Sequence, residues 1–596
     1  MQNLRWNLDA LYPGFDSAEF KTDFDLFESR LKAFSAWTDT GLTGAENAAA
    51  KLEQYISKLI EIRKLMSRLS AFSHLTASVD SRSNQAKQAM DRLRSRSGEV
   101  TQLEVRLVQY LKDLADLDEV IAESDLLREH AFFLKENKRM ADHLLSEKEE
   151  IIISKLRNTG SHAFSQLQGD LTANLLVEVE LSGKRETLPL PAVRNLAYHD
   201  DARVRKTAYY AEQAAYKAVE EASAAAINAI KGEVITVAEL KGYAEPLEET
   251  LEDSRMTRPA LDALLTAIQE YIPHFQAYLK RKGELLGHKK GLPFYDLFAP
   301  VGKNSRTFSY DEAMAYIIAN FQGFSPRLAE YVRHAYENEW LDVEPRVGKR
   351  GGAFCSNLPV IGESRIMSNF SGSFSNMTTL AHELGHGYHG FNLKDESILN
   401  TSYPMPIAET ASIFNETIVV NAALAEADAQ EKIAILETSI SDANQVIVDI
   451  YSRFLFESEL FARRKETTLS VDELKDIMLK AQRQAYGEGL DREVLHPYMW
   501  VNKPHYYRSG LSFYNFPYAF GLLFAKGLYV MYREKGEAFL PLYDKLLNET
   551  GRSDLKDLTA TLGIDLEDPA FFRSSLELIK GDIEEFLKLT EKEAVS

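Results

Sequence analysis

Two histidines and a glutamate stand at the spacing HExxH in the run His382-Glu383-Leu384-Gly385-His386. Four residues make about one turn of an α-helix, so His382 and His386 project from the same face and can bind one metal ion. Glu383 lies about 100° round the helix, close enough to reach a water molecule on that metal. Only 13 histidines occur in 596 residues, so chance seldom produces this pattern. The spacing predicts a zinc site with an adjacent base, as in zinc peptidases.

A catalytic zinc ion needs a third protein ligand, and the fourth position is left for water. Three downstream glutamates are candidates for that ligand: Glu396, Glu409 and Glu416. We favour Glu409, because a proline-containing loop over 402–406 places it in the first turn of a helix predicted over 407–425. That helix can double back on the histidines. Glu396 lies in the intervening loop, and Glu416, two turns deeper, is a candidate to orient a ligand histidine.

The residues that follow the two histidines distinguish among the classes of zinc peptidase. The metzincin pattern requires glycine at position 389 and histidine at position 392, where this chain has His389 and Asn392. Thermolysin-like enzymes would have aspartate four residues after Glu409, where this chain has Ile413. The metzincin class is therefore rejected, and the residues that orient the ligands must differ from those of thermolysin-like enzymes. His389 could contact substrate or make a structural hydrogen bond, and the sequence leaves both open.

A second segment combines one histidine with several tyrosines, from His505 to Tyr518. Such a group can be a buried aromatic core whose hydroxyls are hydrogen-bonded. The phenols are also suitable donors to a developing oxyanion, because they stay protonated near pH 7. Composition alone leaves both interpretations open.

Helical patterning dominates the chain that positions these residues. Apolar residues return at steps of three and four from about Ala45 to Leu114, and similar periodicity continues through 120–170. Residues 175–188 alternate apolar and polar side chains around Ser182-Gly183-Lys184, which predicts a β-hairpin. We therefore expect an N-terminal helical lobe over residues 1–190 that ends in this hairpin. The catalytic domain is predicted over 191–596.

A short strand is predicted at Arg365-Ile366-Met367-Ser368-Asn369-Phe370, just before the metal motif. Zinc peptidases commonly bind the substrate backbone along a strand edge beside the metal helix. The strand could equally serve only to support that helix. Either role places a small sheet near the active site.

The composition restricts location and partners. The chain has 89 acidic and 69 basic residues, and its net charge of −20 disfavours nucleic acid and anionic membranes. The N-terminal sequence lacks the apolar core of a secretion signal, and no window reaches about 18 uninterrupted apolar residues. The single cysteine, Cys355, agrees with a reducing compartment. We expect a cytoplasmic protein in which Cys355 is a buried small residue rather than a redox-sensitive thiol.

The chain resembles a known family at several places. The HExxH run is followed by Ile407-Ala408-Glu409-Thr410-Ala411-Ser412-Ile413-Phe414-Asn415-Glu416, and Trp6-Asn7-Leu8-Asp9-Ala10-Leu11-Tyr12-Pro13-Gly14 opens the chain. Together with Tyr295-Asp296-Leu297-Phe298-Ala299-Pro300, these runs are similar to oligoendopeptidase F, a branch of the thimet oligopeptidase family of zinc metallopeptidases. The resemblance spans nearly the whole chain, and the metal signature is its specific part.

The resemblance implies a fold and a ligand set. The family's fold is mainly α, a two-lobed helical ellipsoid with a deep substrate channel, and its members act on short peptides. One zinc ion per chain would be held by His382, His386 and Glu409. The family also has a histidine and tyrosines that hydrogen-bond the scissile carbonyl. The matching residues here are His505, Tyr514 and Tyr518, with Tyr506 and Tyr507 as open alternatives for the oxyanion contact.

The expected function is zinc-dependent hydrolysis of internal bonds in oligopeptides, with Glu383 as the general base. A dipeptidyl carboxypeptidase on the same scaffold is the closest alternative, since Arg350, Arg365 or Arg508 could capture a C-terminal carboxylate. A non-catalytic peptide-binding protein with a structural zinc is a third possibility. Glu383 argues against it, because a structural site does not require that residue. Side-chain preference, peptide length and oligomeric state are not determined by the sequence.

Overall fold

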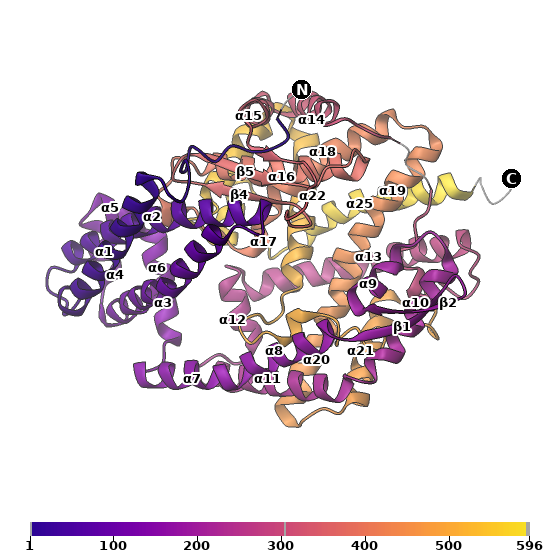
Figure 1. The fold of residues 1–596 in the computed structure, drawn as a ribbon, viewed down its shortest axis with the longest axis horizontal. Helices are drawn as coiled ribbons and strands as arrows, with labels where there is room; N and C mark the ends of the chain where they lie inside the picture. Colours follow the sequence, from indigo (N-terminus) through magenta and orange to yellow (C-terminus); the bar gives the residue numbers. More distant parts are fainter. Residues whose placement is uncertain (1–2, 303–305, 592–596) are drawn as a thin grey trace. The chain divides into compact units, whose positions relative to one another are not determined.

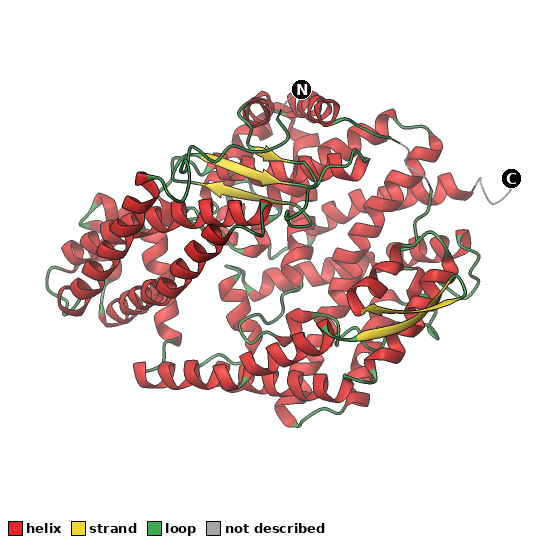
Figure 2. Ribbon diagram, in the orientation of Figure 1, coloured by secondary structure: helices red, strands yellow, loops and turns green. Residues whose placement is uncertain are grey.

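The structure is a computed structural model that describes residues 3–302 and 306–591. Within these ranges the chain is mostly helical, and its strands form two small sheets (Figure 2). The prediction of a mainly α protein is confirmed. Among the helices described, none combines the length and the apolar character that crossing a membrane requires.

The chain folds into two compact units, each assembled from three separate stretches. Unit 1 comprises Met1–Leu144, Ser305–Ala423 and Met531–Ile564. Unit 2 comprises Leu145–Asn304, Leu424–Val530 and Asp565–Ser596. The division into an N-terminal lobe over residues 1–190 and a catalytic domain over residues 191–596 stays a prediction.

Three long helices open unit 1: α1 (Ala18–Gly41), α2 (Ala48–Val79) and α3 (Asn84–Asp113). They pack on one another in a core to which α2 contributes Leu52, Ile56, Leu59 and Leu69, all fully buried. The predicted amphipathic helices are therefore present. Shorter helices follow them: α4 (Leu117–Ala122), α5 (Asp125–Glu129), α6 (Ala131–Met140) and the 3₁₀ turn η1 (Ala141–His143).

A three-stranded sheet in unit 1 lies beside the metal-motif helix. Its strands are β3 (Leu341–Asp342), β4 (Phe354–Leu358) and β5 (Glu363–Met367), in the order β3-β5-β4. Strand β5 runs parallel to β3 and antiparallel to β4, with Ile366 opposite both Leu341 and Cys355. It is the strand predicted at 365–370, displaced by a few residues. Helix α16 (Phe374–Asn392) packs against β4 and β5 (Figure 1).

Further helices complete unit 1. They are α14 (Tyr310–Phe324), α15 (Pro326–Glu337), η4 (Ile398–Asn400), α17 (Met405–Ala408), α18 (Thr410–Glu426), η7 (Gly536–Phe539), α23 (Leu540–Glu549) and α24 (Leu555–Ala560). Helix α23 is tied to α16 by Tyr388, whose hydroxyl donates to Asp544 Oδ1 at 2.5 Å.

Unit 2 contains the predicted hairpin, formed by β1 (Leu176–Leu181) and β2 (Lys184–Pro189). The two strands pair in register from Leu181 opposite Lys184 to Leu176 opposite Pro189. The two turn residues, Ser182 and Gly183, have φ values of 53° and 79°. Positive φ at both central positions matches the twist of a two-residue hairpin turn, which explains why glycine stands there. The hairpin prediction is confirmed.

Helices make up the rest of unit 2. They are α7 (Glu147–Thr159), α8 (Ser161–Ala173), α9 (Leu190–Asn195), η2 (Leu196–Tyr198), α10 (Ala202–Tyr216), α11 (Glu220–Leu240), α12 (Pro246–Asp253), α13 (Arg258–Leu285), η3 (Phe294–Asp296), α19 (Ala429–Asn444), the π-helix η5 (Gln445–Asp449), α20 (Ile450–Glu466), α21 (Val471–Tyr486), η6 (Pro504–Tyr507), α22 (Phe516–Lys535) and α25 (Ala570–Glu591). Helix α22 belongs to unit 2 up to Val530, and its last turn belongs to unit 1. Helix α13 packs along α25, α8 along α11, and α20 along α21.

Candidate active site

Helix α16 carries the two histidines and begins at a defined residue. Ser373 Oγ accepts a hydrogen bond from the backbone N–H of Asn376, and the Asn376 side chain accepts one from Ser373 N–H, so both ends of the first turn are capped. Apolar residues of the helix are buried, whereas the side chains of His382 and His386 remain 25% and 20% exposed. The cap and the buried face together fix which way the histidines point.

Glu409 lies at a break between two helices. The sequence predicted one helix from residue 407 onward; this expectation is corrected by the structure, in which α17 ends at Ala408 and α18 begins at Thr410. Glu409 has φ −89° and ψ 5°, outside regular helix geometry. Its Oε2 atom lies 3.3 Å from His382 Nε2 and 3.4 Å from His386 Nε2. The break therefore aims the carboxylate at both histidines.

The three side chains form a group that could hold a metal ion. One ligand atom from each of His382, His386 and Glu409 lies within 4.8 Å of the others. Two imidazole nitrogens and one carboxylate oxygen are the donor set of catalytic zinc sites that keep a position for water. The residues present therefore fit a zinc ion. Glu396 instead accepts from Asn548 Nδ2 at 3.1 Å, so the geometry favours Glu409 over it.

Two further side chains hold this group in place. Glu416 Oε2 lies 3.2 Å from His382 Nδ1, which is the orienting contact proposed for Glu416 from its spacing. Ser412, fully buried, donates from Oγ to Glu409 Oε2 at 2.8 Å. Sequence reasoning did not single out Ser412. Its position three residues after Glu409, one helical turn away, was the available signal.

A close approach of two backbones brings Glu409 to the histidines. A Cβ atom added at Gly385 would lie 2.4 Å from the Ala411 carbonyl oxygen and 2.6 Å from Ser412 Cα. Real Cβ atoms do not approach other atoms so closely, so α18 can cross α16 at this position only if residue 385 is glycine. Sequence reasoning noted Gly385 only as part of the motif. A glycine inside a helix costs about 1 kcal/mol relative to alanine, and that cost was a signal of a packing role.

Replacing Gly385 with alanine should push the start of α18 away from α16 and move Glu409 off the histidines. Both contacted atoms are backbone, so no side-chain rotation relieves the clash. We expect a loss of unfolding free energy of about 1–3 kcal/mol from overpacking and weaker metal retention. Chemical denaturation and metal analysis measure the two effects. Gly323→Ala is the matched control, because a Cβ there meets nothing within 4 Å; equal effects of both changes would contradict the close-approach argument.

Charges at the cluster keep the carboxylate ionised. Burial lowers the pKa of His382, but hydrogen bonds to Glu409 and Glu416 outweigh it and raise the pKa to about 10. Burial raises the pKa of Glu409, but the two histidines outweigh it and hold that pKa well below its usual range. Without a metal the cluster is thus a hydrogen-bonded ion pair, and a metal must displace its protons.

Glu383 is less exposed to solvent than the three proposed ligand residues. The residue is only 6% exposed. Burial raises the pKa of its carboxyl, with help from the Glu409 charge, while His386, His382 and a backbone hydrogen bond from Cys355 lower it; the net direction is upward. A raised pKa suits a carboxylate that must first take and then release a proton.

Cys355 on β4 is the neighbour of Glu383 and is a free, partly exposed cysteine. Burial, and then the Glu383 charge, raises the pKa of its thiol well above the ordinary value. A thiol kept protonated is a poor nucleophile, which agrees with a packing role. His389 is also buried, with Nε2 2.9 Å from Thr550 Oγ1 and its ring stacked on Tyr403 at 4.0 Å. For His389 the structural hydrogen bond is the alternative that is observed.

The histidine and tyrosines of the C-terminal segment gather in unit 2. The His505 ring stacks on Tyr514 with centroids 5.3 Å apart, and Tyr514 meets Tyr518 edge to face at 5.5 Å. Tyr506 and Tyr507 are 2% and 1% exposed. Those two belong to the core, whereas Tyr514 and Tyr518 are partly exposed. Burial, with Arg453, Arg508 and Lys503, lowers the pKa of His505 and keeps its imidazole neutral.

A buried ion pair anchors this tyrosine segment. Lys231 Nζ lies 2.7 Å from Glu457 Oε1, and both side chains are at most 2% exposed. Glu457 also accepts from Asn515 Nδ2 at 3.1 Å through its second oxygen. Asn515 stands directly between Tyr514 and α22, and Phe513 just before has an unfavourable φ of 51°. The anchor therefore holds a strained turn that presents Tyr514 and Tyr518.

Comparison with known proteins identifies the class. The model of peptidase family M3 matches residues 195–578, and a second model, described as oligopeptidase F, matches residues 113–175. The chain belongs to peptidase family M3. It is a metallopeptidase, and the family resemblance predicted from the HExxH and Glu409 runs is confirmed.

Several relatives match along nearly the whole chain. Oligopeptidase PepF of Bacillus subtilis is 22% identical over 98% of this chain and 87% of its own length. An oligoendopeptidase F homolog of Lactococcus lactis is 23% identical over 99% of this chain and 98% of its own. The crystal structure of oligoendopeptidase-F from Enterococcus faecium superposes with a TM-score of 0.71 at 17% identity, over 96% and 99% of the chains. A peptidase crystal structure from Chlamydophila abortus superposes with a TM-score of 0.84 at 19% sequence identity, over 98% of this chain and 98% of its own.

Proposed function

We propose that the protein is a zinc-dependent oligoendopeptidase that hydrolyses internal bonds of short peptides. The observation that supports it most is the convergence of Glu409 Oε2 on the Nε2 atoms of His382 and His386. Glu383, one residue from the first histidine, is buried and has a raised pKa. Membership of family M3 supplies peptides as the substrate class. The cytoplasm, expected from the sequence, is part of this proposal.

His382, His386 and Glu409 would hold one zinc ion per chain, with Glu416 and Ser412 fixing the orientation of two ligands. When bound, zinc lowers the pKa of a coordinated water toward neutrality and polarises the substrate carbonyl. Zinc is proposed over other divalent ions on the type and number of these ligands.

Glu383 would take a proton from the attacking water and deliver it to the leaving amine. Both steps are possible for one carboxyl because its pKa is raised. The raised pKa makes the free-energy difference between the charged and neutral forms smaller near neutral pH. Its burial also excludes bulk water from the proton transfer.

His505, Tyr514 and Tyr518 would donate hydrogen bonds to the carbonyl oxygen as negative charge develops on it. A neutral imidazole keeps one N–H for this purpose, and the phenols keep their O–H. Loss of one such donor typically costs about 3–4 kcal/mol of transition-state stabilisation. The fixed turn around Asn515 supports this role, because preorganised donors need no rearrangement during the reaction.

The dipeptidyl carboxypeptidase alternative needs a cation free to capture a C-terminal carboxylate. Of the three arginines considered, Arg365 is 2% exposed, donates to the Asn7 carbonyl and pairs with Glu363. That side chain is committed to the fold. Arg350 and Arg508 are exposed, and product analysis distinguishes the two specificities.

The test uses a set of peptides with free and amidated C-termini, with products identified by mass spectrometry. We expect internal cleavage of both kinds, loss of activity on chelation and recovery with zinc. Release of C-terminal dipeptides only from free carboxylates would replace the proposal with the carboxypeptidase. Cleavage that survives complete removal of metal would overturn the metal-dependent mechanism.

A further inference from the structure

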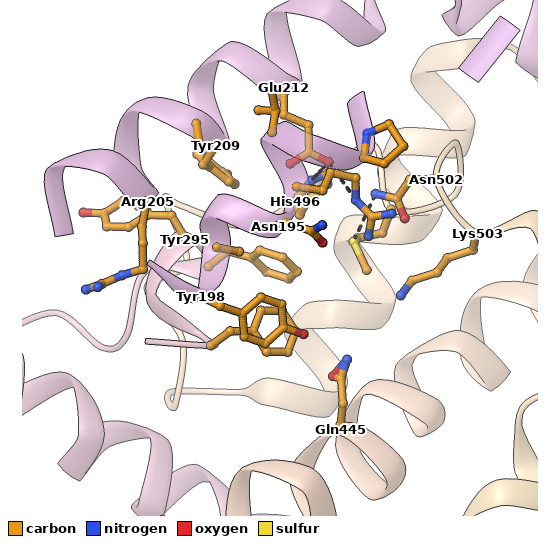
Figure 3. Close-up of a pocket in the computed structure, with 18 residues that line it drawn as sticks. Asn195, Tyr198, Arg205, Tyr209, Glu212, Tyr295, Gln445, His496, Asn502 and Lys503 are labelled. Atoms are coloured by element: carbon orange, nitrogen blue, oxygen red, sulfur yellow. Dashed lines mark hydrogen bonds and ion pairs between the residues drawn. The ribbon is translucent and has the colours of Figure 1, made fainter. Parts of the chain in front are cut away.

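Unit 2 contains a cavity of about 270 Å³ whose lining includes none of the proposed metal ligands, Glu383 or the residues from His505 to Tyr518. Helix α9, η2 and α10 form one wall, and η3 with its flanking residues, η5 and the loop from His496 to Lys503 form the others (Figure 3). Binding sites for drug-sized ligands span about 300–1,000 Å³, so this cavity suits a smaller molecule.

Two of the three long cations that line the cavity are already committed to partners in the fold. Arg205 Nε donates to Asp296 at 2.7 Å, and in Figure 3 its guanidinium points away from the other labelled side chains. Arg194 Nε lies 3.3 Å from Glu212, and Glu212 also accepts from Tyr216 at 2.7 Å. Glu212 is thus already paired with Arg194 and Tyr216, and it acts on Lys503 only through its charge, without an ion pair.

Lys503 is the third cation, and its side chain makes no hydrogen bond or ion pair with residues 3–302 and 306–591, whereas its backbone carbonyl accepts from Tyr506 N–H at 3.2 Å. Its amino group extends toward the cavity and Gln445 (Figure 3). Burial and repulsion from Arg453 lower the pKa of Lys503 to about 7, only partly offset by Asp449. Asp449 itself pairs with Arg453. The cavity therefore contains one cation whose amino group forms no ion pair, because the nearby carboxylates of Asp449 and Glu212 pair with arginines.

Aromatic rings form the opposite side of the cavity. The ring centroids of Tyr198 and Phe298 lie 5.0 Å apart, and those of Tyr209 and Tyr295 lie 5.8 Å apart. Phe294 also lines the cavity. Flat apolar walls that face a single unpaired cation match a ligand with an apolar ring at one end and a negative charge at the other.

We propose that this cavity binds a small carboxylate that carries an aromatic or apolar body, with Lys503 as the partner of the carboxylate. The C-terminal residue of a short peptide and a free aromatic acid share this chemistry. None of the cavity residues belongs to the metal cluster or to the His505–Tyr518 segment. Lys503 lies two residues before His505 and helps to lower its pKa, so the test measures ligand binding and not peptide cleavage.

Binding should be stronger on the acid side of pH 7. The cationic form of Lys503 becomes more populated as the pH falls through about 7, and only that form attracts a carboxylate. The charged and titratable groups that face Lys503 are Asp449 on the π-helix, Arg453 on α20, Arg194 on α9, Glu212 on α10, His496 in the loop and His505 on η6.

The experiment is isothermal titration of the full-length protein with N-acetylphenylalanine, its uncharged amide and inorganic phosphate, with and without a chelator. We expect the carboxylate to bind with the same affinity in both conditions and the amide at least about tenfold more weakly. Equal binding of the amide overturns the proposal. So does phosphate binding as tight as that of the carboxylate, and so does carboxylate binding that chelation abolishes.

Lys503→Met should weaken carboxylate binding at least about tenfold, while Lys289→Met, at an exposed position outside the cavity, should not. Lys503→Arg should keep binding and lose its dependence on pH, because arginine stays charged. This second variant tests the charge even if the methionine variant folds poorly. Unchanged affinity in Lys503→Met, or an unchanged pH dependence in Lys503→Arg, would overturn the assignment.

Discussion

Replacing Glu383 with glutamine is expected to leave the metal content unchanged and to lower peptide cleavage by a factor on the order of 10²–10⁴. The amide has nearly the same shape as the carboxyl, and Glu383 makes no ligand contact with the His382, His386 and Glu409 group. The glutamine amide, however, cannot take a proton from water. Metal analysis and turnover of an internally cleaved peptide, measured on the same preparation, give the two quantities.

Glu409→Ala provides the contrast within the same site. It removes one of three proposed ligands, so we expect metal to be lost on dialysis and activity to depend on added zinc. Glu337→Gln, at an exposed position at the end of α15, is the matched control for loss of one carboxylate charge. If Glu383→Gln retains cleavage, the general-base role is wrong; if Glu409→Ala retains its metal, the third ligand must be reassigned.

The second large effect is expected from Lys231→Met, which should destabilise the protein by about 3–5 kcal/mol. Within the described part of the chain, Glu457 pairs with Lys231 at 2.7 Å and accepts from Asn515, so the change leaves its carboxylate buried with Asn515 as its remaining partner there. Removing one member of a buried pair costs more than the pair contributes, because the remaining charge has lost its solvent as well. Chemical denaturation of the full chain measures the loss.

Two comparisons isolate the cause of that loss. The double variant Lys231→Met with Glu457→Gln should recover part of the stability, because the amide is neutral and can still accept from Asn515. Lys465→Met breaks an exposed pair with Glu239 and should cost at most about 1 kcal/mol. A double variant that is less stable than Lys231→Met would show that packing, and not an unpaired charge, explains the effect.

Lys231→Met should also alter the kinetics of cleavage if Tyr514 and Tyr518 stabilise the oxyanion. Asn515 loses a rigid acceptor when Glu457 becomes mobile, so the turn that presents the tyrosines should loosen. We then expect kcat to fall more than KM rises, because donors aimed at the transition state act mainly on kcat.

The metal cluster was predictable because its geometry is local. The spacing of His382 and His386 needs only the helical period, and Glu409 and Glu416 needed only a turn and one further helix. The hairpin at Ser182 and Gly183 was predictable for a similar reason, since positive φ at two adjacent residues selects a turn type.

Other features depend on contacts that no local pattern encodes. The break at Glu409 follows from the approach of α18 to Gly385, which a helix-period argument does not contain. Lys231 and Glu457 are 226 residues apart, and each alone resembles an ordinary charged helix residue. Lys503 likewise had no sequence signal, because its lack of a partner is a property of the packed cavity.

The three-stretch construction of each compact unit has a consequence for the order of synthesis. Helix α16 is made well before Asp544 and Thr550, which hydrogen-bond Tyr388 and His389, and the whole stretch Leu424–Val530 of the other unit is translated in between. At 5–20 residues per second the ribosome needs roughly 10–30 s to cover that interval. Strands β4 and β5 precede α16, so only the face of α16 that packs on α23 stays uncovered during this time. Neither unit can be expressed as a continuous fragment of the gene.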